Sequence, residues 1–216
     1  MMAQNKYDDG VFFDEFMHLP SQALGLQGAP EWPSFRSLLP AVRGTKVIDL
    51  GCGQGFTCRW AREMGAILAH GIDISEKMLD SAKRFPADPA IEYEHSDLET
   101  IELPLKSCNL VISSLALYYV EHLPSVIAQV FKTLTPGGMF VFSVEHPIYT
   151  SPSNPQWTKD EKAAPLNDYL NEGPRSTNWL TEDVIKQHHT FATYVTLLIQ
   201  AGFSIGAVIE WGPDKE

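Results

Sequence analysis

Three glycines at alternate positions, Gly51, Gly53 and Gly55, directly follow an apolar run over 47–50 and precede a helix-like segment. Glycine adopts backbone conformations with positive φ and lets a ligand lie against bare main chain. The N–H groups at the start of the next helix would favour an anionic group nearby. The loop therefore predicts a nucleotide-binding turn, although such patterns also recur by chance and in several cofactor families.

An acidic residue follows the glycine loop at the distance expected in an α/β nucleotide-binding fold. Asp73 ends the apolar segment 67–72, where an α/β nucleotide-binding fold places the acid that binds a ribose. Its two oxygens can accept the protons of both ribose hydroxyls. The alternative is a solvent-facing carboxylate that happens to follow a strand.

Asp49 separates two classes of nucleotide cofactor. It stands just before the glycine loop, where its charge would repel the pyrophosphate of a dinucleotide, and no glycine comes three residues after Gly53. S-adenosylmethionine carries a sulfonium and an ammonium but no phosphate, and a nearby carboxylate would attract it. The stretch resembles the glycine motif of class I S-adenosylmethionine-dependent methyltransferases. A nicotinamide-dependent oxidoreductase would explain the loop and Asp73, but it would not explain Asp49.

The resemblance covers about 46–211 and implies roles for further residues. Ile74 and Met78 would wall the adenine, although Met78 could equally be core, and Asp97 with the next backbone N–H would read the adenine edge. Two serines at the end of the fourth strand would lie near the methionine part. The implied cofactor-binding set is Asp49, Gly51, Gly53, Gly55, Asp73, Ile74, Met78, Asp97, Leu98, Ser113 and Ser114.

The acceptor side carries weaker signals. Tyr118 and Tyr119 would face the acceptor and could stabilise a sulfonium through their rings, with one of the two expected in the core. His146 is the first candidate for a general base toward an oxygen acceptor, with a structural histidine as an equal alternative. Tyr149 and Arg175 are candidate substrate contacts, and Arg175 could bind a carboxylate or pair with a neighbour.

The elements that must position these groups alternate between strand and helix, which is typical of parallel βαβ units. The pattern predicts a doubly wound, Rossmann-like and mostly parallel α/β sheet with helices on both faces. The predicted strands are 46–50, 67–72, 91–95, 110–114, 139–144 and 203–209. The predicted helices are 12–19, 31–39, 55–64, 76–84, 125–134 and 181–201.

A chain of 216 residues fits one domain with a large core. We expect an N-terminal helical cap over 1–44, a cofactor-binding core over 45–144, a proline-rich and aromatic insertion or lid over 145–180, and a final helix and strand over 181–216. No segment is available for the seventh, antiparallel strand of the family. The sequence is therefore expected to lack a tail.

Composition narrows the class of partner. A net charge of -11 argues against nucleic acid, which needs clustered Lys and Arg. Three cysteines without a CxxC pair argue against a disulfide framework or zinc and favour the cytoplasm. His188 and His189 are adjacent in a predicted helix and point to different faces, so no metal is expected. No run approaches the roughly 18 apolar residues of a membrane span.

These observations predict S-adenosylmethionine-dependent methyl transfer to the oxygen or nitrogen of a small molecule by in-line displacement, with S-adenosylhomocysteine as product. Catalysis would rest on proximity, alignment and exclusion of water. The segments Glu145-His146-Pro147 and Glu210-Trp211-Gly212-Pro213 resemble a bacterial subgroup of small-molecule-type methyltransferases. A catalytically silent cofactor-binding or scaffold protein is the alternative. The acceptor and the oligomeric state stay open.

Overall fold

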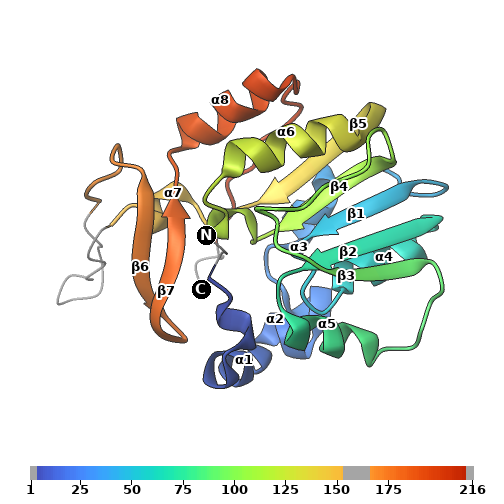
Figure 1. Cartoon of the computed structure of the whole chain (residues 1–216), viewed down its shortest axis with the longest axis horizontal. Coiled ribbons are helices and arrows are strands. Elements are labelled where there is room, and N and C mark those ends of the chain that lie inside the picture. The colour runs from blue at the N-terminus through green and yellow to red at the C-terminus, as the bar shows by residue number, and fades with distance from the viewer. Residues whose placement is uncertain (1–3, 153–165, 213–216) are drawn as a thin grey trace.

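The computed structural model describes residues 4–152 and 166–212, and its centre is one parallel sheet (Figure 1). The strand order β3-β2-β1-β4-β5 places the reversal of chain direction between β1 and β4, which is a doubly wound topology. The predicted α/β fold is therefore confirmed. The strands are β1 (Lys46–Leu50), β2 (Leu68–Asp73), β3 (Ile91–His95), β4 (Cys108–Ser114) and β5 (Leu134–Ser143).

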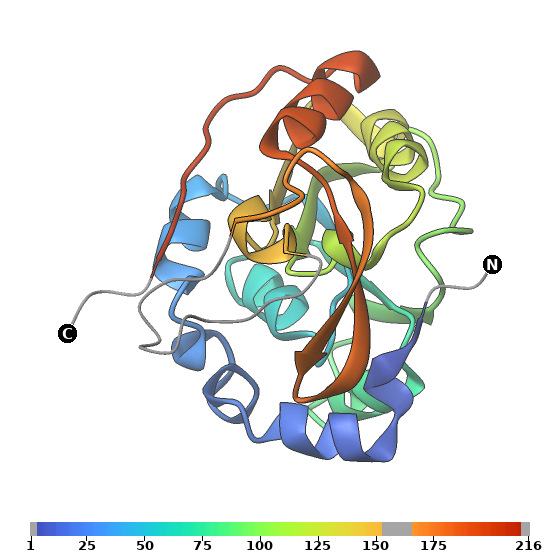
Figure 2. The ribbon, with the colours of Figure 1, turned by 90° about the vertical axis from the view of Figure 1, so that its left-hand side faces the viewer.

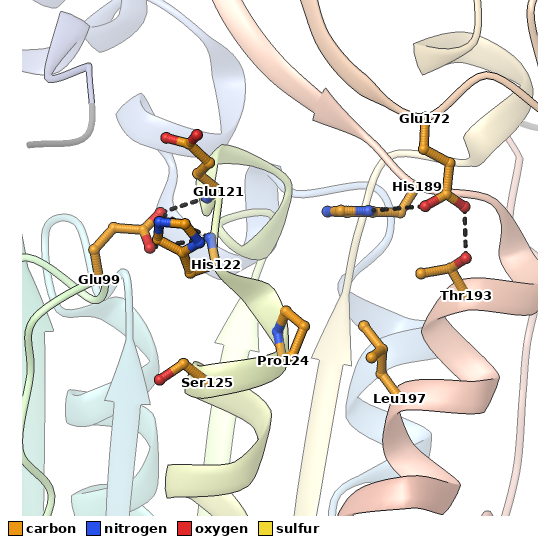
Figure 3. A pocket seen from close by; sticks show the side chains of 9 residues that line it. All are labelled: Glu99, Glu121, His122, Pro124, Ser125, Glu172, His189, Thr193 and Leu197. Carbon is orange, nitrogen blue, oxygen red and sulfur yellow. Dashed lines mark hydrogen bonds and ion pairs between the residues drawn. The ribbon is translucent and has the colours of Figure 1, made fainter. Parts of the chain in front are cut away.

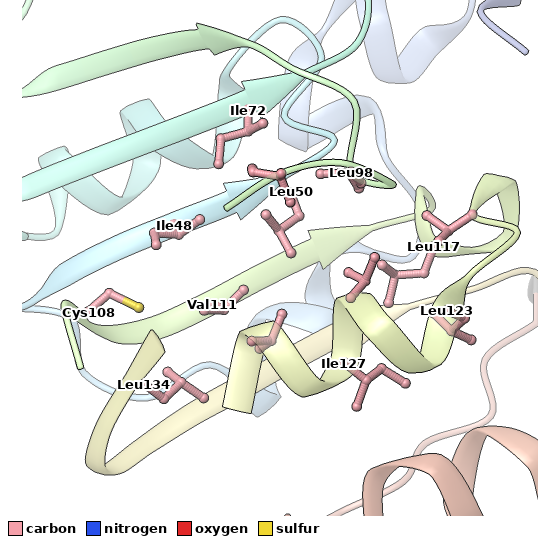
Figure 4. Close-up of a cluster of buried hydrophobic side chains, with 14 of the residues drawn as sticks. Ile48, Leu50, Ile72, Leu98, Cys108, Val111, Leu117, Leu123, Ile127 and Leu134 are labelled. Atoms are coloured by element: carbon pink, nitrogen blue, oxygen red, sulfur yellow. The ribbon is translucent and has the colours of Figure 1, made fainter. Parts of the chain in front are cut away.

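Helices cover both faces of this sheet and bury two apolar cores. On one face Ile127 of α6 packs with Ile48 and Val111 of the sheet (Figure 4). On the other face Phe35 and Trp60 pack with apolar residues of β1 and β4. The helices and 3-10 turns are η1 (Lys6–Asp8), α1 (Gly10–Met17), α2 (Pro20–Ala23), η2 (Gly25–Gly28), α3 (Trp32–Leu38), α4 (Phe56–Glu63), α5 (Glu76–Lys83), η3 (Leu117–Tyr119), α6 (Leu123–Thr133), α7 (Pro147–Thr150) and α8 (Phe191–Ala201).

The central strand β1 is apolar and buried apart from its first residue, as expected for a parallel strand covered on both faces. Asp49 is the charged residue among the buried positions of β1. It lies opposite Gly71 of β2 and Ile112 of β4. Because the strands are parallel, the loops after β1, β2 and β4 meet at one edge of the sheet. That edge is where the predicted cofactor residues converge.

The segment after β5 differs from the prediction. Residues 181–188, predicted as the first half of a helix, form β7 (Thr181–His188), which pairs with β6 (Gly173–Trp179) in an antiparallel hairpin. The helix begins only at Phe191, where the Thr190 side chain accepts the N–H of Thr193. Val184, Lys186 and His188 are buried on alternate positions, and a spacing of four fits a strand as well as a helix.

The predicted sixth strand over 203–209 is also wrong. The structure has no helix or strand over 203–212, and Val208 and Ile209 are about half exposed. Phe203 packs against the rings of Phe131 and Phe140, but the residues after it form no ladder with β5. An apolar run becomes a strand only where its backbone finds a partner.

None of the helices in the described ranges has the length and apolar composition to cross a membrane.

The hairpin lies at the carboxyl ends of the sheet strands, in front of the sheet in Figure 2. Arg175, opposite Lys186 in the hairpin register, fastens it there. The Arg175 guanidinium donates to the carbonyl oxygens of Ser151 at 2.9 Å and Pro174 at 3.2 Å, and also to those of Asp168 and Asn171. Its donors are thus used by backbone, and only 7% of the residue is exposed. Arg175 has a structural role in this geometry and does not present its charge to a pocket.

We therefore predict that Arg175→Met lowers the free energy of unfolding by about 2–4 kcal/mol, because one buried and several partly buried carbonyl oxygens lose their donor. Urea denaturation checks this, with Arg84→Met on the exposed end of α5 as the matched control. Equal midpoints for the two variants would contradict the structural role of Arg175.

Candidate functional site

A pocket opens at the carboxyl edge of β1, β2 and β4, where the topology reverses. Its walls come from the glycine loop, the ends of β2 and β4, the loop after β3, and the N-terminal segment. The lining residues are Gln4, Tyr7, Gly51, Gly53, Asp73, Ile74, Met78, Asp97, Leu98, Ser114, Leu115, Ala116, Tyr119 and Val120. Most of the residues predicted for the cofactor therefore line one cavity.

The glycine loop requires glycine for two different reasons. Gly51 has φ 75°, and a Cβ there would stand 2.3 Å from the Cβ of Ala116, so the loop can approach this wall only without a side chain. Gly55 does not line the pocket. A Cβ there would stand 2.1 Å from the hydroxyl of Tyr93, so Gly55 serves the packing of α4 on β3.

Asp73 connects the glycine loop to the start of α5. Its Oδ2 accepts the N–H of Gly53 at 2.7 Å, and its Oδ1 accepts the N–H of Ser75 at 2.9 Å. Burial raises the pKa of Asp73, and these two N–H donors oppose the shift. Each carboxylate oxygen keeps a further lone pair. Asp73 can therefore hold the loop and still accept two hydroxyl groups from the pocket.

Asp49 lies beneath the loop and does not line the pocket. It is 2% exposed, and its Oδ2 receives a weak contact from the thiol of Cys58 at 3.8 Å. Burial, with a smaller contribution from Asp73, raises the pKa of Asp49 to about 7. Its influence on a cationic ligand would act through space, and such a ligand would favour the ionised form.

The two predicted serines have different surroundings. Ser114 lines the pocket, and its hydroxyl is 3.3 Å from that of Ser143 on β5. Ser113 is fully buried and donates to the carbonyl of Leu50 at 2.8 Å, which ties β4 to β1. Only Ser114 is placed to touch a ligand.

The N-terminal segment supplies part of the pocket that the sequence did not reveal. Gln4 and Tyr7 line the cavity. Asp8 holds the segment down, since it accepts the hydroxyl of Ser75 at 2.6 Å and the N–H of Lys77 at 3.1 Å. These residues carry no motif. The polar stretch before the first helix gave no signal that it would fold back over β2.

The tyrosine pair is divided between the core and the pocket. Tyr119 lines the pocket, and its hydroxyl is 3.3 Å from that of Tyr7. Tyr118 is buried beneath the ammonium of Lys186, which lies 5.4 Å from the centre of its ring. Burial raises the pKa of Tyr7, Tyr118 and Tyr119 well above the usual value, so these phenols stay protonated at neutral pH.

His146 lies away from this pocket. Its Nδ1 accepts the N–H of Ile148 at 3.2 Å and so caps α7, and its Nε2 contacts Glu210 at 2.8 Å. Because Nδ1 accepts, the ring proton is on Nε2 and is donated to Glu210. Tyr149 is 64% exposed and also lies outside the pocket lining. The structure does not bring these two residues together with the cofactor set.

A second, more open groove of about 560 Å³ lies between the starts of α6 and α8 (Figure 3). Two of its carboxylates, those of Glu99 and Glu172, are engaged by the protein itself. Glu99 accepts the backbone N–H groups of Glu121 and His122, and Glu172 accepts the N–H of Thr190 and contacts His189 at 3.5 Å. The carboxylates of Glu99 and Glu172 in this groove therefore serve the segments before α6 and α8.

His188 is the last residue of β7 and His189 follows it, so the pair does not lie on a helix as predicted. His188 is buried between Thr150, at 2.8 Å, and the carbonyl of Tyr169, at 2.9 Å. Within residues 4–152 and 166–212, no group of three or more His, Cys, Asp and Glu side chains is arranged to hold a metal ion.

The buried Asp49 leads to a prediction about pH. Its pKa in the folded state, about 7, exceeds its ordinary value of 3.8, so the stability that it contributes is present below pH 4 and is lost as the pH rises to about 7. Asp49→Asn should remove this loss. Relative to wild type, the variant should gain on the order of 2 kcal/mol between pH 5 and pH 7.5. Urea denaturation across this range tests it. Parallel stability curves for wild type and Asp49→Asn would contradict it, and Asp80→Asn on α5 is the exposed control.

Comparisons with known proteins indicate the family of the chain. A family model described as a methyltransferase domain matches residues 48–142. A Haemophilus influenzae protein without an assigned activity is 34% identical over 210 residues, which is 92% of this chain and 83% of that one. The malonyl-[acyl-carrier protein] O-methyltransferase of Enterobacter lignolyticus is 35% identical over 105 residues, but this match spans only 49% of this chain and 41% of the relative.

Solved structures extend the similarity over most of the chain. An S-adenosylmethionine-dependent methyltransferase from Mesorhizobium loti is 48% identical with a TM-score of 0.83, and the match covers 88% of each chain. A structure from Listeria monocytogenes is 40% identical with a TM-score of 0.80, covering 86% of this chain and 89% of that one. The pocket and these similarities together show that the chain belongs to the class I S-adenosylmethionine-dependent methyltransferases and is an enzyme of that family.

Proposed function

We propose that the protein transfers a methyl group from S-adenosylmethionine to the oxygen or nitrogen of a small molecule by in-line displacement. The observation that carries this proposal is the single pocket that joins Asp73 and the glycine loop to the hydroxyl of Tyr119. One end of this pocket offers what an adenosine needs, and the other offers an aromatic wall for an acceptor.

The residues of the cofactor end fit S-adenosylmethionine in kind. Asp73 would accept the ribose hydroxyls, Ile74 and Met78 would enclose the adenine, and Asp97 would receive its amino group. The bare backbone at Gly51 would lie along the methionine part. When bound, the cofactor supplies an electrophilic methyl group, and the protein supplies its position.

The acceptor end would work mainly by alignment and by exclusion of water. The N-terminal segment brings Tyr7 over the pocket, where its ring meets Phe12, Phe16 and Tyr119 edge-on. A roof of this kind leaves room for a small acceptor and little room for a folded macromolecule. This supports a small-molecule acceptor and argues against nucleic acid or a membrane surface as substrate.

Two further expectations belong to this proposal. The name of the Enterobacter relative specifies an acyl group on a carrier protein, so a carrier-bound acyl chain is the second candidate acceptor. We also infer a cytoplasmic protein that needs no metal, consistent with the free thiols of Cys52, Cys58 and Cys108. A silent, cofactor-binding role is the outcome expected if binding occurs without turnover.

The cofactor site is tested by calorimetric titration of S-adenosylhomocysteine into wild type and Asp73→Ala. The variant should bind about 10–100-fold more weakly, because two hydrogen bonds to a carboxylate are lost and Gly53 loses its anchor. NADH should bind neither protein.

Asp80→Ala, which removes an exposed carboxylate from α5, is the matched control and should bind like wild type. Thermal melting without ligand separates a loss of binding from a loss of fold. Equal affinity of wild type and folded Asp73→Ala would refute the role given to Asp73.

A further inference from the structure

One buried ion pair stands beside the pocket without a part in cofactor binding. The ammonium of Lys186 on β7 contacts both carboxylate oxygens of Glu145 at 2.8 Å. The Lys186 side chain is 5% exposed, whereas that of Glu145 is 35% exposed. The ammonium also lies 5.1 Å from the ring of Trp179 and 5.4 Å from that of Tyr118.

Stability alone does not account for this pair. Lys186 occupies an inward position of the hairpin between Val184 and His188, where an apolar side chain would pack. Burying two charges costs desolvation, and apolar replacement of such pairs is often neutral or stabilising. The pair therefore invites a functional explanation.

The surroundings of Glu145 include proton donors. The ammonium that it binds lies 5.4 Å from the ring of Tyr118, and burial keeps the phenols of Tyr7, Tyr118 and Tyr119 protonated. Protonated phenols and an ammonium donate hydrogen bonds. Each oxygen of Glu145 keeps a lone pair beyond the one facing Lys186. Within this cluster, Glu145 is thus the group that can take up a proton.

Glu145 does not itself line the pocket, but it follows a strand end whose neighbours do. It follows β5 by two residues, and Ser143, the last residue of β5, pairs with Ser114. The Oγ of Ser143 accepts the N–H of Leu115 at 3.2 Å, and Ser114 and Leu115 both line the pocket. The end of β5 thus brings Glu145 next to residues that line the pocket. Lys186, which it binds, lies beside Tyr118, whose ring is 4.6 Å from that of Tyr119 in the pocket wall.

We propose that Glu145 is a catalytic residue that removes the proton from a neutral hydroxyl acceptor, and that Lys186 is the positioning residue that holds its carboxylate in place. This inference rests on the proposed function. The acceptor oxygen forms a bond to the methyl carbon, the carbon–sulfur bond breaks with its electron pair left on sulfur, and the hydroxyl proton passes to Glu145 and then to water.

The same cluster indicates the class of acceptor. The pair of Glu145 and Lys186 has no net charge, and the neighbouring rings of Tyr7, Tyr119 and Trp179 are apolar with hydroxyl edges. A neutral aromatic or apolar body that carries a hydroxyl fits this wall. A carboxylate acceptor would lie against Glu145 and be repelled, and it would need no base.

His146, the base expected from the sequence, does not compete for this role. Both of its ring nitrogens are engaged, with Ile148 and with Glu210. Consecutive residues after the strand have turned to opposite sides, so Glu145 faces the tyrosines and His146 faces the segment after α8.

The test uses the full chain, methyl-labelled S-adenosylmethionine and a bacterial metabolite extract, followed by purification of the labelled product. We expect a product that is stable to mild alkali, as an ether is and a methyl ester is not. With the purified acceptor, Glu145→Gln should lower kcat by about 10²–10⁴ with KM within about threefold. Its affinity for S-adenosylhomocysteine should stay that of wild type.

Glu182→Gln, on the exposed side of the same hairpin, is the matched control and should keep wild-type kcat. Lys186→Met should lose most of kcat, and Lys186→Arg should recover a large part of it, because an arginine can still hold the carboxylate. If Lys186 only stabilised the fold, Lys186→Met and Lys186→Arg proteins of equal thermal stability would have equal kcat.

The outcomes separate the two proposals. Wild type that binds S-adenosylhomocysteine and labels nothing would overturn the proposed function, and this inference with it. An alkali-labile methyl ester would overturn the inference and leave methyl transfer standing. A Glu145→Gln variant with wild-type kcat would also overturn the inference and leave methyl transfer standing. This result would be clearest if His146→Gln were inactive.

Discussion

The carboxylate of Asp73 is the interaction on which the site depends. Its two oxygens accept N–H groups from the glycine loop and from the start of α5, so two connections of the sheet are fixed relative to one another. The parallel arrangement makes this possible, because it delivers the ends of β1 and β2 to the same edge. Asp49 is buried beneath the same loop, and burial raises its pKa to about 7.

The rest of the molecule closes this edge from two directions. The N-terminal segment is fastened to α5 through Asp8, and the hairpin is fastened to the loop before it through Arg175. Both elements bring aromatic rings, and Trp179 of the hairpin meets Phe12 and Phe16 of α1. The acceptor end is thus built from segments far apart in sequence, whereas the cofactor end comes from consecutive loops.

That difference explains how much the sequence could predict. The central strands were readable because buried parallel strands are mostly continuous apolar runs with turn residues between them, as in β1 and β4. The cofactor residues follow such strands directly, so their positions came with the strands. The hairpin was misread because burial at every second residue and apolar spacings of three and four coincide at Val184 and His188.

The acceptor end could not be derived in the same way. Whether Glu145 or His146 turns toward β7 depends on the turn after β5, where His146 caps α7 and Glu145 contacts Lys186. The role of Arg175 likewise depends on carbonyl groups whose positions no local pattern specifies. Long-range packing decided these side chains, and residue type alone did not.

The central claim is that the pocket at the carboxyl edge of β1, β2 and β4 holds the methyl donor. A crystal structure of the full chain with S-adenosylhomocysteine tests it most directly. The account predicts ribose hydroxyls on Asp73, adenine beside Asp97 and Met78, and the sulfur directed toward Tyr119. Density for the nucleoside in the groove between α6 and α8, with the glycine loop free of ligand, would contradict it.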